Sequence, residues 1–257
     1  MNVTSTAATG MPLPAPTVLL YNQQGPALVP MTPQEVRADT NASTALKSAR
    51  TTINWIAKHL GEAPFATPTN PVRIALQPNY NNAYWDGDKK LLTLGGGDGT
   101  KYKAFTSLDT VAHELIHARQ SPTVGYSGES GAVTESVADL VAEVIDGGDW
   151  RLAADVFQGG FRDLATPKVS HRSMLQENPG IHALAGLSSL AGVRSAKVVG
   201  GTAMAQLWWN TAKALGDRPS LELLAQGTIN SALKYWGAGT REAQAVRDAW
   251  VSVGVIS

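Results

Sequence analysis

The sequence predicts an α+β protein of two lobes: a shortened N-terminal α/β lobe over residues 1–106 and a mainly helical C-terminal lobe over residues 107–257. Two observations favour this class. Before residue 100, short apolar runs alternate with turn residues, which is typical of a small sheet. After Ser107, apolar residues recur at helical spacing.

Length, charge and composition restrict the function. The chain has 257 residues, 21 basic and 21 acidic side chains, and no cysteine. Balanced charge without a basic block argues against a nucleic-acid partner. No apolar run reaches the roughly 18–20 residues that a membrane span requires, so we expect no membrane partner. Without cysteine, any metal has to be held by His, Asp and Glu.

In the N-terminal lobe we expect one helix and several strands. Residues 1–42 predict loops around a single strand at "TVLLY" (17–21). Residues 43–60 carry an apolar stripe at helical spacing and end at a glycine, which predicts a helix. A strand is predicted at "PVRIALQ" (71–77), and a hairpin-like stretch with turn residues at both ends at 83–99.

In the C-terminal lobe we expect helices separated by Gly, Pro and Ser. Their predicted ranges are 107–120, 132–146, 180–193, 203–215, 220–235 and 241–253. The first of them lies at the junction of the two lobes, and a cleft between lobes is a favoured place for an active site.

The junction helix carries "DTVAHELIHARQ", in which His113 and His117 are four positions apart. Residues at this spacing share one face of a helix, so the two imidazoles can reach one metal ion, with Glu114 one step round the helix. The alternative is an amphipathic helix with two surface histidines. The motif alone does not decide between the two.

A second segment, "SGAVTESVADLVAEV", supplies acidic residues for the same site. Catalytic zinc normally takes three protein ligands, and Glu135 can complete a set of two histidines and one carboxylate. Asp139, one turn later, can accept the outer N–H of a ligand histidine and hold its ring. The alternative for both residues is a solvated acidic helix face.

Several segments together resemble the thermolysin-like family of bacterial neutral zinc metalloproteases, across about residues 70 to 257. The matching segments are "YNNAYWDG" (80–87), "GGDG" (96–99), "DTVAHELIHA", "YSGESGAVTESVAD", "ENPGIHALAG" (177–186) and "ALKYWGAGTREAQAVRDAWVSVGV" (232–255). The resemblance implies a shortened two-lobe zincin with the active-site cleft between its lobes. It implies a zinc endopeptidase that hydrolyses peptide bonds with zinc-activated water.

The resemblance also assigns roles to single residues. It implies that His113, His117 and Glu135 hold zinc and that Glu114 transfers the proton of the attacking water. Tyr126 and His182 match the donors that stabilise the transition state, and Glu177 is placed to orient His182. One departure is Thr134, where the family commonly has Asn, so we expect weaker support of the zinc ligands at that position.

For the substrate, the resemblance implies recognition along a sheet edge. Asn82 and the backbone of Ala83 match positions that pair with an extended peptide. Arg162 matches an arginine that contacts the substrate carbonyl. Phe161 stands where the family usually has Leu. We therefore expect a somewhat altered pocket for the bulky apolar residue after the scissile bond.

The resemblance gives only partial support for a calcium site. The candidate ligands are Asp109, Asp146 and Asp149, whereas Arg151 and Ala154 replace acidic residues of the family's cluster. Because calcium requires six to eight oxygen ligands, we expect at most one ion there.

The partner is expected to be a peptide or protein substrate, acted on by a monomer. The family resemblance implies a secreted protein. The first 20 residues lack the basic start and apolar segment of a secretory signal, which leaves a mature form, a cytoplasmic protein or signal-independent export open. Two alternatives to a general endopeptidase also stay open: a narrow-specificity effector or toxin protease, and a zinc-containing protein that binds peptides without cutting them.

Overall fold

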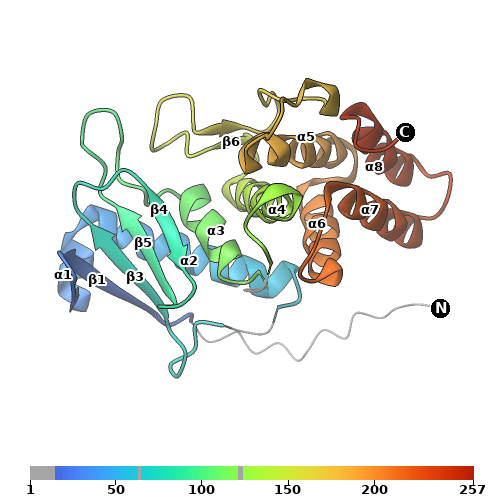
Figure 1. Ribbon diagram of the computed structural model, residues 1–257. Helices are drawn as coiled ribbons and strands as arrows, with labels where there is room; N and C mark the ends of the chain where they lie inside the picture. Colours follow the sequence, from blue (N-terminus) through green and yellow to red (C-terminus); the bar gives the residue numbers. More distant parts are fainter. Residues whose placement is uncertain (1–14, 63–64, 121–123) are drawn as a thin grey trace, which may run out of the picture.

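A five-stranded mixed sheet lies at one end of the protein in the computed structural model, which describes residues 15–62, 65–120 and 124–257 (Figure 1). The strands follow one another in the order β2-β1-β3-β5-β4, and β1, β3 and β5 are parallel. Their bounds are β1 Val18–Gln24, β2 Ala27–Pro30, β3 Val72–Gln77, β4 Ala83–Asp86 and β5 Leu91–Gly95. All five residues of β5 are buried, whereas β4, antiparallel to β5, forms one edge of the sheet.

Helix α2 (Thr40–His59) precedes β3 in the chain and supplies apolar residues to both halves of the molecule. Asp39 caps its first turn by accepting a hydrogen bond from the Ala42 N–H. The buried stripe includes Ala45, Ile53 and Ile56. Ile53 packs in the hydrophobic cluster of the sheet, while Ile56 packs in the cluster of the helical lobe.

The N-terminal segment contains more structure than the sequence predicted. Strand β2 and helix α1 (Pro33–Ala38) lie where we expected loops, and residues 1–14 are outside the described residues. Helix α1 has a detectable sequence signal, because Thr32 and Glu35 form a reciprocal capping box.

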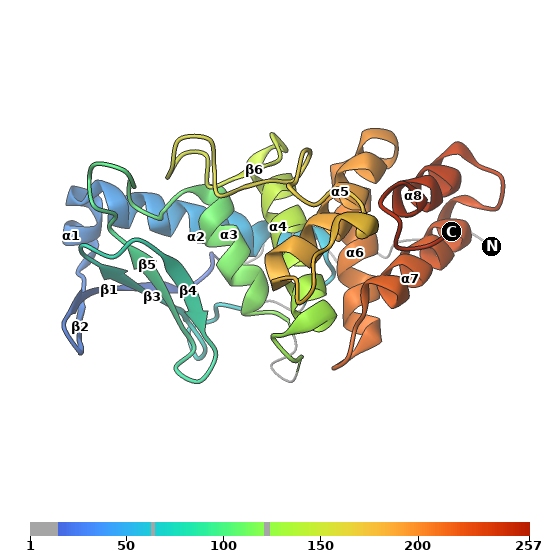
Figure 2. The same ribbon diagram turned by 45° about the horizontal axis from the view of Figure 1, so that its top comes forward.

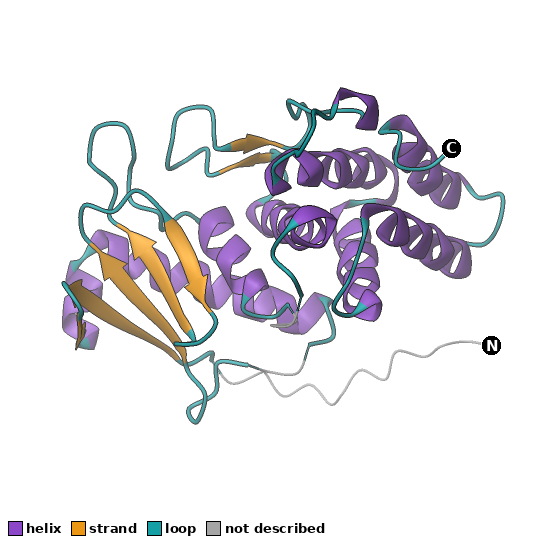
Figure 3. Ribbon diagram, in the orientation of Figure 1, coloured by secondary structure: helices purple, strands orange, loops and turns teal. Residues whose placement is uncertain are grey.

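Helices fill the other end of the molecule (Figure 3). They are α4 (Gly128–Asp146), α5 (Ile181–Val199), α6 (Gly201–Leu215), α7 (Leu221–Trp236) and α8 (Arg241–Ser252). Helix α4 is the centre of this lobe and packs against α3 (Leu108–His117), α5, α6 and α7. The α+β prediction is confirmed. The long helices begin and end within four residues of their predicted bounds, except that α5 continues to Val199, six residues beyond its predicted end.

Two stacked tryptophans, Trp208 of α6 and Trp250 of α8, are fully buried in the hydrophobic core of the helical lobe. The rings of Trp208 and Trp250 lie 5.5 Å apart between centroids and are nearly parallel. Their N–H groups donate to Ser188 Oγ at 3.1 Å and to Thr228 Oγ1 at 2.8 Å, so the buried polar atoms are satisfied.

Helix α3 (Leu108–His117) lies between the sheet and the helical lobe, as both views show (Figures 1 and 2). Val111 and Leu115 belong to the cluster of the sheet, and Ile116 belongs to the cluster of the helical lobe. The short strands β6 (Arg151–Leu152) and β7 (Arg162–Asp163) and the 3-10 turn η1 (Arg172–Met174) were not predicted. No helix among the described residues is both long and apolar enough to span a membrane.

Buried carboxyl groups gather where α3, α4 and the loop after α4 meet. Glu143 is 1% exposed; its Oε2 accepts the Arg151 N–H at 3.1 Å, and its Oε1 has no hydrogen-bond partner. Burial, together with the charges of Asp109 and Asp149, raises the pKa of Glu143 to about 8. Burial and the same two aspartates, with Asp155, raise the pKa of Asp146 to about 6.

We expect Glu143→Gln to stabilise the protein at alkaline pH. In the folded state Glu143 binds a proton up to about pH 8, against an ordinary carboxyl pKa of 4.5, so stability falls as pH rises through that window. The variant removes this loss. Its melting temperature should exceed that of the wild type by about 2–4 °C at pH 8.5, with the difference shrinking towards pH 5. The exposed Glu222→Gln variant is the control, and a constant difference across this range contradicts the prediction.

Candidate active site

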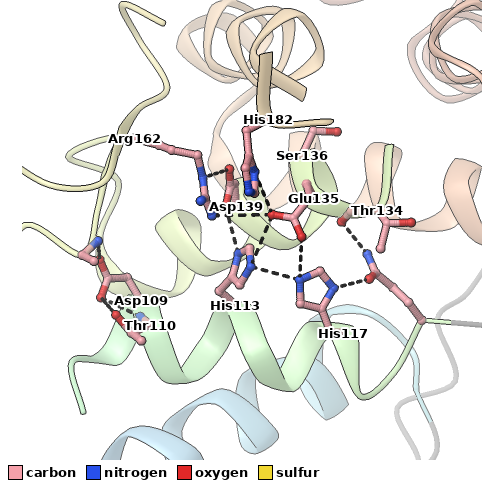
Figure 4. A network of polar contacts seen from close by, with 12 residues as sticks. Asp109, Thr110, His113, His117, Thr134, Glu135, Ser136, Asp139, Arg162 and His182 are labelled. Atoms are coloured by element: carbon pink, nitrogen blue, oxygen red, sulfur yellow. Dashed lines mark hydrogen bonds and ion pairs between the residues drawn. The ribbon is translucent and has the colours of Figure 1, made fainter. Parts of the chain in front are cut away.

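Helices α3 and α4 bring three potential metal ligands together (Figure 4). The Nε2 atoms of His113 and His117 are 3.0 Å apart. His117 Nε2 lies 3.2 Å from Glu135 Oε1, and His113 Nε2 lies 3.7 Å from Glu135 Oε2. One ligand atom from each side chain lies within 4.8 Å of the other two. The alternative of two surface histidines is excluded, since the side chains of His113 and His117 are 8% and 15% exposed. The alternative of a solvated acidic face is excluded as well, since Glu135 is 1% exposed.

The outer nitrogens of both imidazoles face oxygen atoms. His113 Nδ1 lies 2.9 Å from Asp139 Oδ1, although its N–H is not well aligned with that oxygen. His117 Nδ1 lies 2.8 Å from Gln120 Oε1. Acceptors on the outer side favour a proton on Nδ1, which directs the Nε2 lone pairs at the common point between the ligands.

The electrostatics of the three groups favour a positive charge between them. Burial opposes ionisation of Glu135, but hydrogen bonds from His117 and His182 hold its pKa well below the usual range. Burial alone would lower the pKa of His117, yet the hydrogen bond and charge of Glu135 and the charge of Glu114 raise it to about 9. A proton or a metal cation at this point compensates the buried carboxylate.

The donor set fits zinc. Two imidazole nitrogens and one carboxylate are a common protein ligand set for catalytic zinc, which keeps a further position open. The cavity beside the site has the room for such a position. Among the described residues, no other cluster of His, Asp and Glu brings three ligand atoms this close together.

Arg162, at the start of β7, is tied to Asp139. Its Nε and Nη2 donate to the two carboxylate oxygens of Asp139 at 2.8 and 2.7 Å. Asp139 is buried, and the charges of Arg162 and His113 lower its pKa despite that burial. Arg162 also lines the cavity. Arg162, which was predicted to contact the substrate, is therefore linked through Asp139 to the potential metal ligand His113.

Glu114, Tyr126 and His182 surround the ligand group. Glu114 Oε2 accepts the backbone N–H of Trp85 at 2.9 Å, which joins α3 to the edge strand β4. The Tyr126 hydroxyl donates to Glu135 Oε1, and burial together with that carboxylate raises the pKa of Tyr126 above its ordinary value. His182, in the first turn of α5, places Nδ1 3.3 Å from Glu135 Oε2.

Glu177 is not brought to His182. No hydrogen bond or ion pair joins the two side chains in the part of the chain that the structure describes. His182 is the second residue of α5 and its Nδ1 faces Glu135, whereas Glu177 lies in the loop before that helix, three residues ahead of Gly180, the N-cap. The expected orienting role of Glu177 has no support in this geometry.

The ligand group opens into a cavity of about 550 Å³ between β4 and the segment from Leu152 to Arg162. Asn82 and Ala83 line its strand side. On the other side Phe161, 44% exposed, stacks on Tyr102, Phe105 and Phe157 with centroid distances of 5.7 to 5.8 Å. The cavity thus combines an exposed backbone edge, the potential metal ligands and an aromatic wall.

Two of the candidate calcium residues, Asp109 and Asp149, lie near enough to Asp146 to raise its pKa, but the oxygens of the three do not form a close ligand group. Asp109 accepts backbone N–H groups from Thr110 at 2.6 Å and from Ala153. Asp149 accepts the Arg151 N–H at 2.8 Å. Asp109, Asp146 and Asp149 do not appear together as a group of close ligand atoms among the described residues. The Asp109 and Asp149 carboxylates are thus held by backbone donors, and calcium binding there stays a prediction.

Sequence reasoning missed two contacts of the site. In one of them the backbone N–H of Trp85 donates a hydrogen bond to Glu114, and because every residue type except proline has such an N–H, the sequence carries no signal for it. Gln120 had a weak signal, because it lies three residues after His117 and spacing of three or four brings side chains to one face of a helix.

Comparison with known proteins agrees with this geometry. The family model described as thermolysin metallopeptidase, catalytic domain, matches residues 29–120, and the one described as thermolysin metallopeptidase, alpha-helical domain, matches residues 123–255. Over 204 residues the chain is 32% identical to bacillolysin of Brevibacillus brevis, and over 196 residues it is 30% identical to extracellular elastase of Staphylococcus epidermidis. These matches cover 68% and 70% of this chain.

The chain is much shorter than those relatives, since the matches span 38% of each relative's length. Among solved structures, the precursor of protealysin, a metalloproteinase from Serratia proteamaculans, superimposes with a TM-score of 0.82 at 20% identity. That match covers 99% of this chain and 91% of the other, which shows a shared fold. Because the two family models together match most of the chain, the protein belongs to the thermolysin metallopeptidase family.

Proposed function

We propose that the protein is a zinc-dependent endopeptidase. The observation that carries this proposal is the convergence of His113, His117 and Glu135 beside the Glu114 carboxylate, in a cavity bordered by an open strand edge. The three ligands alone would suit any zinc protein. The neighbouring carboxylate and the strand edge supply what peptide hydrolysis needs in addition.

His113, His117 and Glu135 would hold the zinc ion. The chemistry that zinc supplies there is Lewis acidity, which polarises a carbonyl and lowers the pKa of water towards neutrality. Asp139 and Arg162 support His113 from behind, since the guanidinium holds Asp139 ionised and Asp139 faces the outer nitrogen of the imidazole.

Glu114 would act as the general base. One of its oxygens is held by the Trp85 N–H, which limits rotation of the carboxylate at the cavity wall. In this position Glu114 accepts the proton of the attacking water and later passes it to the leaving nitrogen. Tyr126 and His182 would donate hydrogen bonds to the oxygen on which negative charge develops, since both side chains reach the ligand group from the open side.

A peptide would bind as an added strand along β4. This strand pairs with β5 on one side only. On its other edge the Trp85 N–H is bound by Glu114, so the backbone of Ala83 and the side chain of Asn82 are the groups proposed to bind the peptide. We propose that an apolar side chain following the scissile bond packs against Phe105 and Phe161, which line the cavity. We also propose that the protein is secreted, because the Staphylococcus relative is an extracellular elastase.

The first test is the Glu114→Gln variant. We expect it to keep its zinc, because Glu114 is outside the ligand group, and to lose about 10²- to 10⁴-fold in kcat/KM, because a general base is missing. Cleavage sites in a mixed peptide library are mapped for both proteins by mass spectrometry, with Glu222→Gln as control. Cuts before apolar residues that vanish only in Glu114→Gln support the proposal. A wild type that binds zinc and peptide without cutting would identify a binding protein instead.

Zinc binding should weaken as pH falls. The pKa of His117 is raised to about 9 in the metal-free site, so below that pH zinc has to displace a proton from a ligand. We expect the apparent Kd to rise about tenfold per unit between pH 8 and pH 6, measured by competition with a chromophoric chelator. His117→Ala should show a shallower dependence. A Kd that is constant over this range contradicts the assignment of His117.

Phe161 should influence the choice of residue after the scissile bond. Phe161→Leu shortens the aromatic wall, so we expect kcat/KM for peptides with Phe at that position to rise about tenfold relative to peptides with Val. Phe157→Leu is the matched control, since Phe157 belongs to the same stack but does not line the cavity. If both variants change the ratio of kcat/KM values equally, the change results from a loss of packing in the aromatic stack and not from the cavity wall.

A further inference from the structure

His117 has a side-chain acceptor on its outer nitrogen. The residue next to the third ligand, on the neighbouring helix α4, is Thr134. The Thr134 hydroxyl is occupied, since it donates to the Ser130 carbonyl at 3.0 Å. Instead, the oxygen that faces His117 Nδ1 at 2.8 Å belongs to Gln120, in the turn that follows α3.

The orientation of the Gln120 amide follows from its second contact. Gln120 Nε2 lies 2.8 Å from the backbone carbonyl of Thr134, and a carbonyl oxygen can only accept. The amide nitrogen therefore faces Thr134, and Oε1 faces His117. Because Oε1 can only accept as well, His117 has to carry a proton on Nδ1. In the neutral ring this leaves Nε2 unprotonated, on the side of His113 and Glu135 (Figure 4).

The backbone at Gln120 is itself held in place. Its N–H lies 3.0 Å from the Ile116 carbonyl and 3.2 Å from that of His117, which continues the last turn of α3. The preceding residue, Arg119, donates to Glu62 at 2.7 Å and lies over the ring of Phe65. Glu62 also binds Lys213 of α6. The turn that presents Gln120 is thus anchored to both halves of the molecule.

We propose that Gln120 is a positioning residue for the metal site: it bridges α3 and α4, and it sets the tautomer and ring orientation of His117. Gln120 would thereby take over support that Thr134 cannot provide. The proposal rests on the proposed function in one respect, that His117 is a zinc ligand. It does not depend on whether the protein cleaves peptides.

The test compares Gln120→Leu with the wild type. Leucine has a similar size but no acceptor, so His117 loses the partner of Nδ1. We expect zinc affinity, measured by competition with a chromophoric chelator, to fall about 10- to 100-fold. The melting temperature of the metal-free protein reports any general loss of packing. Gln244→Leu, an exposed glutamine on α8, is the control.

A spectroscopic readout separates positioning from packing. In zinc-loaded protein labelled with ¹⁵N-histidine, the wild type should show a slowly exchanging Nδ1–H signal of His117, identified by its loss in His117→Ala. The chain has only five histidines, which makes the spectrum tractable. In Gln120→Leu this proton should exchange rapidly with water or disappear. Gln120→Glu, which keeps an acceptor oxygen, should retain the signal and bind zinc within a few-fold of the wild type.

The outcomes are distinct. If Gln120→Leu keeps both its zinc affinity and the protected Nδ1–H signal, the proposal is wrong. A wild type that binds zinc but cuts no peptide overturns the proposed function alone, and Gln120 is still judged by the zinc affinities. If the wild type takes up no zinc, both proposals fall.

Discussion

The burial of α3 on two sides is the constraint on which the rest of the site depends. Val111 and Leu115 pack into the core of the sheet, and Ile116 packs into the core of the helical lobe. A helix held on both flanks cannot rotate without exposing one of these stripes. The remaining face of the helix carries His113, Glu114 and His117. In the structure this face is directed at α4 and the cavity.

Charge compensation explains the arrangement of side chains around this face of α3. Glu135 and Asp139 are each 1% exposed, and an isolated buried carboxylate is strongly unfavourable. Arg162 and His113 compensate Asp139, while His117, His182 and Tyr126 donate to or face Glu135. The same contacts that make burial tolerable also aim the histidines. Because all the ligands lie on long helices, the site is positioned by the core and not by flexible loops.

The two lobes contribute different parts of the proposed chemistry. The helices supply buried ligands, because their side chains converge between packed surfaces. The sheet supplies a backbone edge for the peptide, because β4 is an edge strand and lies beside the cavity. The Trp85 N–H on Glu114 connects the two, since it links the residue proposed to move the proton to the strand proposed to hold the peptide. A change in the packing of α3 against β4 would disturb both.

The sequence by itself determined the α+β class and the long helices, because apolar periodicity is a local property of the chain. The spacing of His113 and His117, together with the family resemblance for Glu135, predicted the ligand group that the structure brings together. Short elements such as α1 and β2 escaped prediction, since brief patterns compete poorly with loop composition. Only the tertiary structure decided which partners meet. Among the described residues, Gln120 contacts His117, Arg162 binds Asp139, no bond joins Glu177 to His182, and the candidate calcium carboxylates form no close ligand group. Such contacts depend on how α3, α4 and the loops pack in space, which no local pattern of residues encodes.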